Sequence, residues 1–468
     1  MATRRSIWAV SLASFLSQLA VGSLSRAPSW DEAIYLSQVT RGVPALPFVA
    51  SRARGITLLV VPLTSIGAPQ WTVRLFLAAL SSLVLALAFL LWAPVVGWGA
   101  VVGAGLFAAS WPALFYGSEA MPNLWAALLA VGVVGCFART VVGGDVVGLR
   151  HAGAVLTVTA ALMALMRTPD AVVLAIALTV AALLLRSRMK ALGALWLGVA
   201  VGALPWLIEM SVRFGGPIGA IEAASAISHL QGGASGVGAH LALTDGPLLG
   251  PDGSGAIPGV GVVWWIGLIA LAAVAAAGRR GGSETIAARL AALTGLALAA
   301  EYLFLIGGLA PRFLLPALAL LSLAAGCGIV TLHSRGRLRS RPALAATAVA
   351  LAGWFAWQVV TFDRLEASAA DERARSQAIG DAIREHVGSS SCLVASTHDF
   401  PQVAFAAGCA GRALEDVSAS SLAPLEAAAE GGKVIVVSRD PTLEPPSEPL
   451  ALPSGDWVAF EMDATDPP

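Results

Sequence analysis

The stretch that decides the fold reads WTVRLFLAALSSLVLALAFLLW at residues 71–92. Arg74 is its only charged side chain, and a helix of this length crosses the ~30 Å hydrocarbon core of a bilayer. Two further apolar stretches follow almost without interruption, at 95–116 and 119–138. This succession predicts a polytopic α-helical membrane protein.

The same pattern continues on both sides of this stretch. We expect about eleven transmembrane helices, at residues 6–24, 71–92, 95–116, 119–138, 150–166, 168–186, 190–210, 259–278, 286–307, 311–331 and 343–362. The N-terminal run could pass for a signal peptide, but the many later runs favour an uncleaved first span. Segment 55–68 is short and contains Pro62, so we interpret it as a juxtamembrane or re-entrant piece.

Composition supports the membrane assignment and divides the chain into two domains. Of the 468 residues 57% are hydrophobic and 12% charged, which excludes an ordinary soluble enzyme, a disordered chain and a nucleic-acid binder. The net charge of zero hides two opposite parts: residues 1–362 hold 22 basic and 11 acidic side chains, and residues 363–468 hold 7 and 18. We therefore predict a membrane domain over 1–362 and a small soluble domain over 363–468.

The soluble domain shows alternating strand and helix patterns. Strands are expected at 391–395 and 433–438, helices at 401–407 and 422–430, and a last strand at 457–462, which predicts a small α/β unit. Its cysteines, Cys392 and Cys409, would be able to form a disulfide outside the cytoplasm, and the sequence leaves open whether they do.

The distribution of charge predicts the orientation in a plasma membrane. With the N-terminus inside, 14 of the 22 basic residues of the membrane domain fall in short cytoplasmic loops, as the positive-inside rule requires. Nine of its 11 acids then fall outside or at the outer ends of spans. We expect the C-terminus and any chemistry to lie on the extracytoplasmic side.

Two external segments are large. The first, at about 25–54, contains WDEAIY at 30–35, and its stretch 31–41 is predicted to form an amphipathic helix on the membrane surface. The second, at about 211–258, is rich in Gly, Ser and Pro, which is typical of a mobile loop that closes over a ligand.

The adjacent acids Asp31 and Glu32 are the sharpest chemical signal. A carboxylate in a partly dry pocket can act as a general base, and arginine is the side chain best suited to gripping a phosphate with two hydrogen bonds. Candidate arginines on the same face of the membrane are Arg52, Arg54, Arg167 and Arg312. Acidic pairs more often cap helices on solvated surfaces, so the signal depends on its position directly after the first span.

At this point the membrane domain resembles a known family. WDEAIY after the first span and PRFLLPALALL at 311–321 are similar to sequences in GT-C superfamily glycosyltransferases, which use polyprenyl-phosphate-linked sugars. Within this superfamily, the branch that contains the protein O-mannosyltransferases and aminoarabinose transferases is the most similar to this sequence. SEAMPN at 118–123, MRTPDAVVL at 166–174 and FGGP at 214–217 match that branch more loosely.

The resemblance implies roles for individual residues. Asp31 would be the catalytic base with Glu32 as its partner, and Arg312 would hold the carrier phosphate. Where relatives have a Lys or His near the end of the first loop, this chain offers Arg52 or Arg54, and the choice stays open. The remaining candidates for substrate binding are Tyr35, Glu119, Asn123, Arg167 and Asp170, although Arg167 and Asp170 could instead pair with each other. We expect neither a metal nor another cofactor.

Together these features predict an inverting glycosyltransferase of the plasma membrane. It would move a sugar from a polyprenyl-phosphate carrier to a hydroxyl of a glycan, lipid or protein on the outer face. The alternative is a transporter or lipid flippase for cell-envelope precursors, although the halves show no clear repeat. A third possibility is a non-catalytic assembly partner that binds through its soluble domain.

Overall fold

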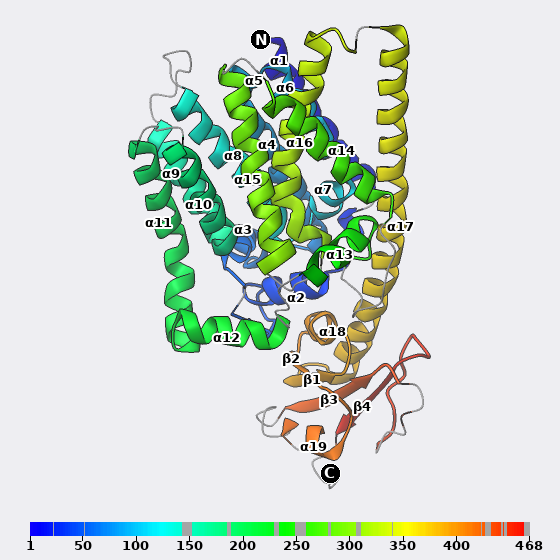
Figure 1. Cartoon of the computed structure of the whole chain (residues 1–468). Coiled ribbons are helices and arrows are strands. Elements are labelled where there is room, and N and C mark those ends of the chain that lie inside the picture. The colour runs from blue at the N-terminus through cyan, green and yellow to red at the C-terminus, as the bar shows by residue number, and fades with distance from the viewer. Residues whose placement is uncertain are drawn as a thin grey trace.

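The computed structural model describes residues 1–468 except 22, 51, 143–151, 185–188, 229–233, 249–258, 279–281, 306–309, 339, 423, 426–431, 441–442, 444–446 and 463–468. It contains a bundle of membrane helices with a small sheet domain at one end, while the N-terminus lies at the other end (Figure 1).

Six of the described helices are long and apolar enough to cross a membrane. They are α4 (Gln70–Leu90), α8 (Pro122–Val142), α11 (Met189–Phe214), α15 (Ser283–Ala300) with a π-helical turn (Glu301–Leu305), α16 (Leu315–Ser334) with the preceding 3-10 turn η5 (Pro311–Leu314), and α17 (Arg341–Val387). The shorter apolar helices are α3 (Gly55–Thr64), α6 (Trp98–Ala108), α9 (Ala152–Met166), α10 (Thr168–Leu184) and α14 (Gly261–Ala276). The protein is therefore a multi-pass membrane protein, while eleven crossings and the N-in, C-out orientation stay predictions.

The remaining helices and turns complete the bundle. They are α1 (Ala2–Ala20), η1 (Ser23–Ser25), α2 (Trp30–Ser37), α5 (Ala93–Val96), α7 (Trp111–Tyr116), α12 (Pro217–Ser228), α13 (Ala234–Ala242) and η3 (Leu243–Asp245). The expected span 95–116 is thus divided among the end of α5, α6 and α7, and α6 does not continue into α7 because Pro112 cannot donate a backbone hydrogen bond. The break is held by Gln358 of α17, whose side-chain oxygen accepts a bond of 2.6 Å from the Trp111 amide.

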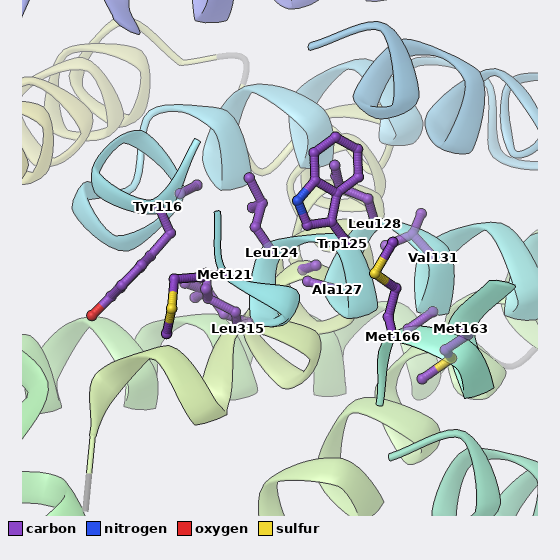
Figure 2. Packing of buried hydrophobic residues seen from close by; sticks show 14 of the residues in the cluster. Tyr116, Met121, Leu124, Trp125, Ala127, Leu128, Val131, Met163, Met166 and Leu315 are labelled. Carbon is purple, nitrogen blue, oxygen red and sulfur yellow. The ribbon is translucent and has the colours of Figure 1, made fainter. Parts of the chain in front are cut away.

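The core of the bundle lies around α8 and α16. In each of these helices 83% of the apolar window is buried, against 6% in α17, which stands at the edge of the bundle. Figure 2 shows side chains of α8, α9 and α16 packed together, among them Trp125, Met163 and Leu315. Helix α6 approaches α16 closely, since a Cβ added at Gly103 would lie 2.6 Å from the Cα of Leu323.

The C-terminal domain is a four-stranded sheet beside the end of α17. Strands β1 (Cys392–Ser396), β2 (Ala410–Ala413) and β3 (Lys433–Ser438) are parallel, and β4 (Val458–Met462) is antiparallel to β3 in the order β2-β1-β3-β4. Helices α18 (Phe400–Ala407) and α19 (Ala419–Leu422) follow β1 and β2. This confirms the predicted α/β pattern, although most of the expected helix at 422–430 lies outside the described residues.

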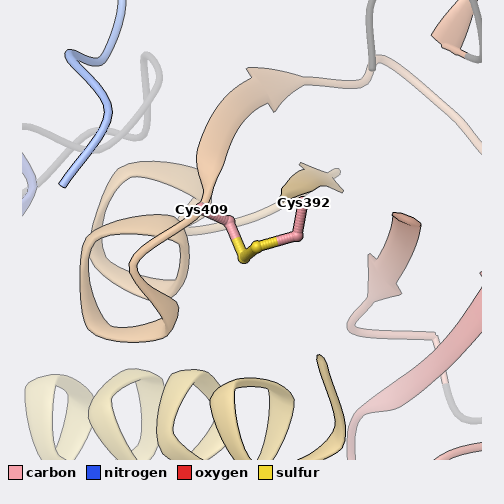
Figure 3. The surroundings of a disulfide bond; sticks show 2 residues. All are labelled: Cys392 and Cys409. Carbon is pink, nitrogen blue, oxygen red and sulfur yellow. A yellow bond between two sulfur atoms is a disulfide. The ribbon is translucent and has the colours of Figure 1, made fainter. Parts of the chain in front are cut away.

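A disulfide joins Cys392 at the start of β1 to Cys409 just after α18 (Figure 3). The bond fixes α18 against the strand that precedes it. The structure thus decides the pairing that the sequence left open.

Helix α17 runs without a break from the membrane part into the soluble domain. The Ser340 hydroxyl caps its first turn by accepting a bond from the Ala343 amide, and Gly388 ends it with a φ of 64°, a conformation that glycine adopts readily. The predicted boundary between residues 362 and 363 falls inside this helix. A single continuous helix therefore connects the two parts.

The expected surface helix at 31–41 is wrong in its length and position. Helix α2 covers Trp30–Ser37, and every residue from Glu32 to Ser37 is buried. It packs beside α3 and under α18 of the C-terminal domain, where Trp30 and Phe400 meet edge to face at 5.2 Å. The apolar side of α2 is therefore covered by protein.

Segment 211–258, which the sequence predicts to be an external mobile loop, is mostly helical where it is described. Helices α12 and α13 and the turn η3 lie within it, and its mobility and its side of the membrane stay predictions. Residues 229–233 and 249–258 of this segment lie outside the described residues.

Candidate active site

The candidate site is built around the first turn of α2. Ser29 caps this helix: its hydroxyl accepts from the Glu32 amide at 3.4 Å, and the Glu32 carboxylate accepts from the Ser29 amide at 3.0 Å. This capping box fixes the direction of the Glu32 side chain, while Asp31 takes no part in it. The two acidic side chains separate into two environments, because neighbouring residues of a helix point in different directions.

Asp31 lies between two arginines. Its Oδ1 is 2.6 Å from Nη2 of Arg52, and its Oδ2 is 2.8 Å from Nη2 of Arg312. The three side chains are between 12% and 18% exposed, so a ligand can approach them. Burial acts to raise the pKa of Asp31, but the two guanidinium groups outweigh it and hold this pKa below its ordinary value.

Tyr35 stands one helical turn after Asp31. The Arg52 guanidinium lies 5.3 Å from the centre of its ring, and the Phe48 ring meets it edge to face at 5.8 Å. Burial raises the pKa of the Tyr35 phenol, and Arg52 only partly opposes this rise. The phenol therefore stays neutral and can donate a hydrogen bond.

Arg54 points away from Asp31. It binds the carboxylate of Glu209 on α11 at 2.6 Å and 3.0 Å and the Gln38 side chain at 2.9 Å. Of the two arginines between which the sequence could not choose, Arg52 is the one that contacts Asp31.

Glu32 lies in a closed network behind the site. Its side chain is fully buried and accepts from Arg74 at 3.1 Å and from the Ala120 amide at 2.8 Å. Arg373 of α17 lies 3.8 Å from Glu32 and 2.7 Å from Glu119. The network therefore joins the first loop, the second loop and α17.

Arg26 extends this network on the far side of Glu119. It binds Glu119 at 2.8 Å and also pairs with Glu366 of α17. Sequence reasoning missed Arg373 and Glu366, since both had been assigned to the soluble domain. The charge pattern of α17 carries no signal of which face meets the membrane domain.

Asn123 lies at the start of α8 and is buried. Its amide nitrogen has no hydrogen-bond partner among the described residues. The structure places it near the second loop with Glu119 and does not bring it into contact with Asp31.

A third group of side chains lies on the other flank of Asp31. Arg167 contacts Asp170 at 3.0 Å, and both bind the Tyr302 hydroxyl of the π-helical turn. Tyr302 stacks on Phe313, the neighbour of Arg312, with ring centres 5.2 Å apart. The ion pair between Arg167 and Asp170, which the sequence left as an alternative, is present. Arg167 is also close enough to lower the pKa of Asp31.

Potential metal ligands do not converge in the described part of the chain. No group of three or more His, Cys, Asp or Glu side chains there could hold an ion. The arrangement at Asp31 offers instead one carboxylate and two cations on one accessible surface, which suits the binding of a phosphate next to a general base.

Solved structures of other proteins share the overall fold of this chain. No protein-family model matches the chain, and no curated protein sequence matches it. Its overall fold is nevertheless similar to that of the solved structures of ArnT and AglB, which confirms the expected resemblance at the level of the fold.

The particular structures are as follows. The chain is similar to ArnT from Cupriavidus metallidurans bound to undecaprenyl phosphate, with a TM-score of 0.65, 15% identity and 98% of each chain covered. It is also similar to the archaeal oligosaccharyltransferase AglB from Archaeoglobus fulgidus in complex with an inhibitory peptide and a dolichol-phosphate. There the TM-score is 0.56 and the identity 11%, over 92% of this chain and 69% of AglB.

Proposed function

We propose that the protein is a membrane glycosyltransferase that takes a sugar from a polyprenyl-phosphate carrier. The observation that carries this proposal is the Asp31 carboxylate held between Arg52 and Arg312 at the accessible face of a GT-C fold. The similar structures of ArnT and AglB were determined with lipid phosphates bound, which supports the class of donor.

The reaction follows from competition for the two arginines. A carrier phosphate that binds Arg52 and Arg312 neutralises the charges that hold the pKa of Asp31 low, so this carboxylate becomes a stronger base. Asp31 then removes the proton of the acceptor hydroxyl. The hydroxyl oxygen forms a bond to the anomeric carbon, and the bond from this carbon to the phosphate oxygen breaks.

The leaving electron pair goes to the phosphate, where the two guanidinium groups stabilise it. Because there is one displacement, the configuration at the anomeric carbon inverts. Tyr35 and the Arg167–Asp170 pair flank this centre and are proposed to position the sugar.

The buried acids receive a different role. Glu32 and Glu119 have their charges satisfied by Arg74, Arg26 and Arg373, so we assign them to holding the loops and α17 in place. Arg54 is assigned to anchoring the first loop on α11, and Asn123 stays a candidate for acceptor binding.

We further propose that this face is extracytoplasmic. The C-terminal domain lies at the same end of the bundle as Asp31, and the N-terminus lies at the opposite end (Figure 1). The positive-inside pattern puts the N-terminal end in the cytoplasm. The acceptor is then a hydroxyl of an envelope glycan, lipid or protein.

The test is a transfer assay in sealed vesicles. Mass spectrometry of lipid that copurifies with the protein identifies the donor headgroup, and the labelled carrier is then supplied with external acceptors. Label must appear in the acceptor with the inverted configuration, and free lipid phosphate must be released. Movement of carrier or solute across the vesicle without any transfer would instead support the transporter.

A further inference from the structure

A polar cavity lies in the C-terminal part, separate from the Asp31 site. It has a volume of about 250 Å³ and is lined by Ser368, Glu372, Arg375, Asp399, Arg439 and Trp457. The first three come from one face of α17, and the others come from the sheet domain. The cavity therefore lies at the junction between this helix and the sheet.

The topology of the sheet marks this place as a binding position. Strand β1 lies between β2 and β3 in the sheet. The chain runs from β1 to β2 on one side of it and then crosses to β3 on the other side. In open α/β sheets ligands bind at the carboxyl ends of parallel strands where the order changes direction in this way. Asp399 follows the end of β1, and Arg439 directly follows the end of β3.

The backbone at Asp399 is held in an unusual conformation. Its φ of 51° makes it the single non-glycine residue with positive φ in the described part of the chain. Asp399 precedes the first residue of α18, so the turn aims its side chain back over the end of the sheet toward α17, where Ser376 lies 3.5 Å from its carboxylate.

The charges in the cavity limit the chemistry of its occupant. Two carboxylates, Glu372 and Asp399, disfavour an anion, and two guanidinium groups, Arg375 and Arg439, disfavour a cation. A neutral molecule that carries hydroxyl groups can donate to the first pair and accept from the second. The volume corresponds to about eight water molecules, which suits a single sugar ring.

We propose that this cavity is a binding subsite for a neutral saccharide unit. It is connected to the Asp31 site by short contacts: Phe400, next to Asp399, packs on Trp30, and Trp30 precedes Asp31. On α17, Arg373 follows Glu372 and belongs to the network around Glu32. The subsite does not require the proposed transfer reaction, but it would hold a glycan acceptor on the same side as the catalytic centre.

The experiment measures binding without turnover. The full-length protein in nanodiscs of neutral lipid is titrated with methyl glycosides of the common neutral hexoses and pentoses, and binding is observed by saturation-transfer NMR. Wild type is expected to bind at least one of them at millimolar concentration. Glu372→Gln and Asp399→Asn should each weaken this binding by about tenfold or more, since each removes a charged hydrogen-bond acceptor. Asparagine tolerates the positive φ of position 399, so this variant keeps the turn.

Two variants serve as controls. Glu385→Gln changes an exposed acid of the same helix outside the cavity and should bind as wild type does. Asp31→Asn should also keep the binding, so that failure of the proposed reaction and failure of this subsite give different results. Absence of binding by every glycoside, equal loss in the Glu385→Gln control, or loss only in Asp31→Asn would overturn the proposal, as would preferential binding of inorganic phosphate.

Discussion

Replacing Asp31 by Asn separates the two roles that the structure gives to this region. The substitution keeps the shape of the side chain but removes the base, so sugar transfer is expected to fall. General bases contribute about 10²–10⁴-fold to rates, which corresponds to about 3–5 kcal/mol in the barrier.

Binding of the carrier is expected to change in the opposite direction. In the free protein the Asp31 carboxylate occupies Arg52 at 2.6 Å and Arg312 at 2.8 Å, and a phosphate must displace or share these contacts. At a separation of about 6 Å and an effective dielectric constant of about 20, the repulsion between carboxylate and phosphate amounts to about 3 kcal/mol, which partial exposure reduces. Asp31→Asn should therefore bind the lipid phosphate about tenfold more tightly.

The assay pairs a transfer measurement with a binding measurement on the same preparation. Transfer is followed with labelled carrier, and affinity is measured by titrating the sugar-free lipid phosphate in nanodiscs. A thermal unfolding curve checks the fold, because the variant leaves two half-buried arginines without their carboxylate. Normal transfer by Asp31→Asn would falsify the assignment of the base. Weaker binding of the phosphate would refute the competition.

The pH dependence of wild type tests the same competition. Burial acts to raise the pKa of Asp31, but Arg52 and Arg312 lower it below the ordinary value, so the free enzyme keeps its base charged to a lower pH than an ordinary aspartate does. Bound phosphate cancels this effect and raises the pKa. Since kcat/KM reports the free enzyme and kcat reports the complex, the acid limb of kcat should lie at the higher pH. Coincident acid limbs would contradict the mechanism.

Three further predictions concern the surroundings of Asp31. Arg52→Gln should weaken carrier binding by about tenfold or more in the titration, because it removes a charged hydrogen-bond donor, while the matched variant Arg54→Gln should leave that affinity unchanged. Glu32→Gln should lower the free energy of unfolding by about 3–5 kcal/mol, because it leaves buried arginines uncompensated. Denaturant titration in detergent measures this change, and an unchanged stability would refute the structural role. Replacing both Cys392 and Cys409 by Ser should destabilise the C-terminal domain by about 3 kcal/mol, given the sequence separation of 17 residues, and proteolysis of this domain under reducing conditions measures the effect in wild type.

Part of the site could be predicted from local sequence alone. Asp31 and Arg312 stand directly after or before apolar runs, so their place at a membrane boundary follows from hydropathy. The capping pattern Ser29-x-x-Glu32 also lies within four residues. Nothing local, however, distinguishes the role of Asp31 from that of Glu32, because the difference comes from the partners: Arg52 and Arg312 for one, Arg74 and the Ala120 amide for the other.

Helix α17 shows why the domain boundary was harder to place. Hydropathy falls after residue 362, and this change suggested that one unit ended there. A change of solvent alters which side chains are favourable, but it does not by itself break a helix, and no proline lies between residue 362 and Gly388, where the helix ends. The continuation of this helix brings Arg373 to the acids of the membrane domain.

The sequence by itself determined that this chain is a helical membrane protein with an acidic α/β domain, because hydropathy and strand alternation are local and repeat over many residues. It also predicted that the candidate site residues gather on one face, since charges avoid the hydrocarbon core. Only the tertiary structure decided which of these charges meet. Residues 31, 52 and 312 are far apart along the chain, and their contacts depend on how the loops and helices pack. The local periodicity of the sequence carries no information about this packing.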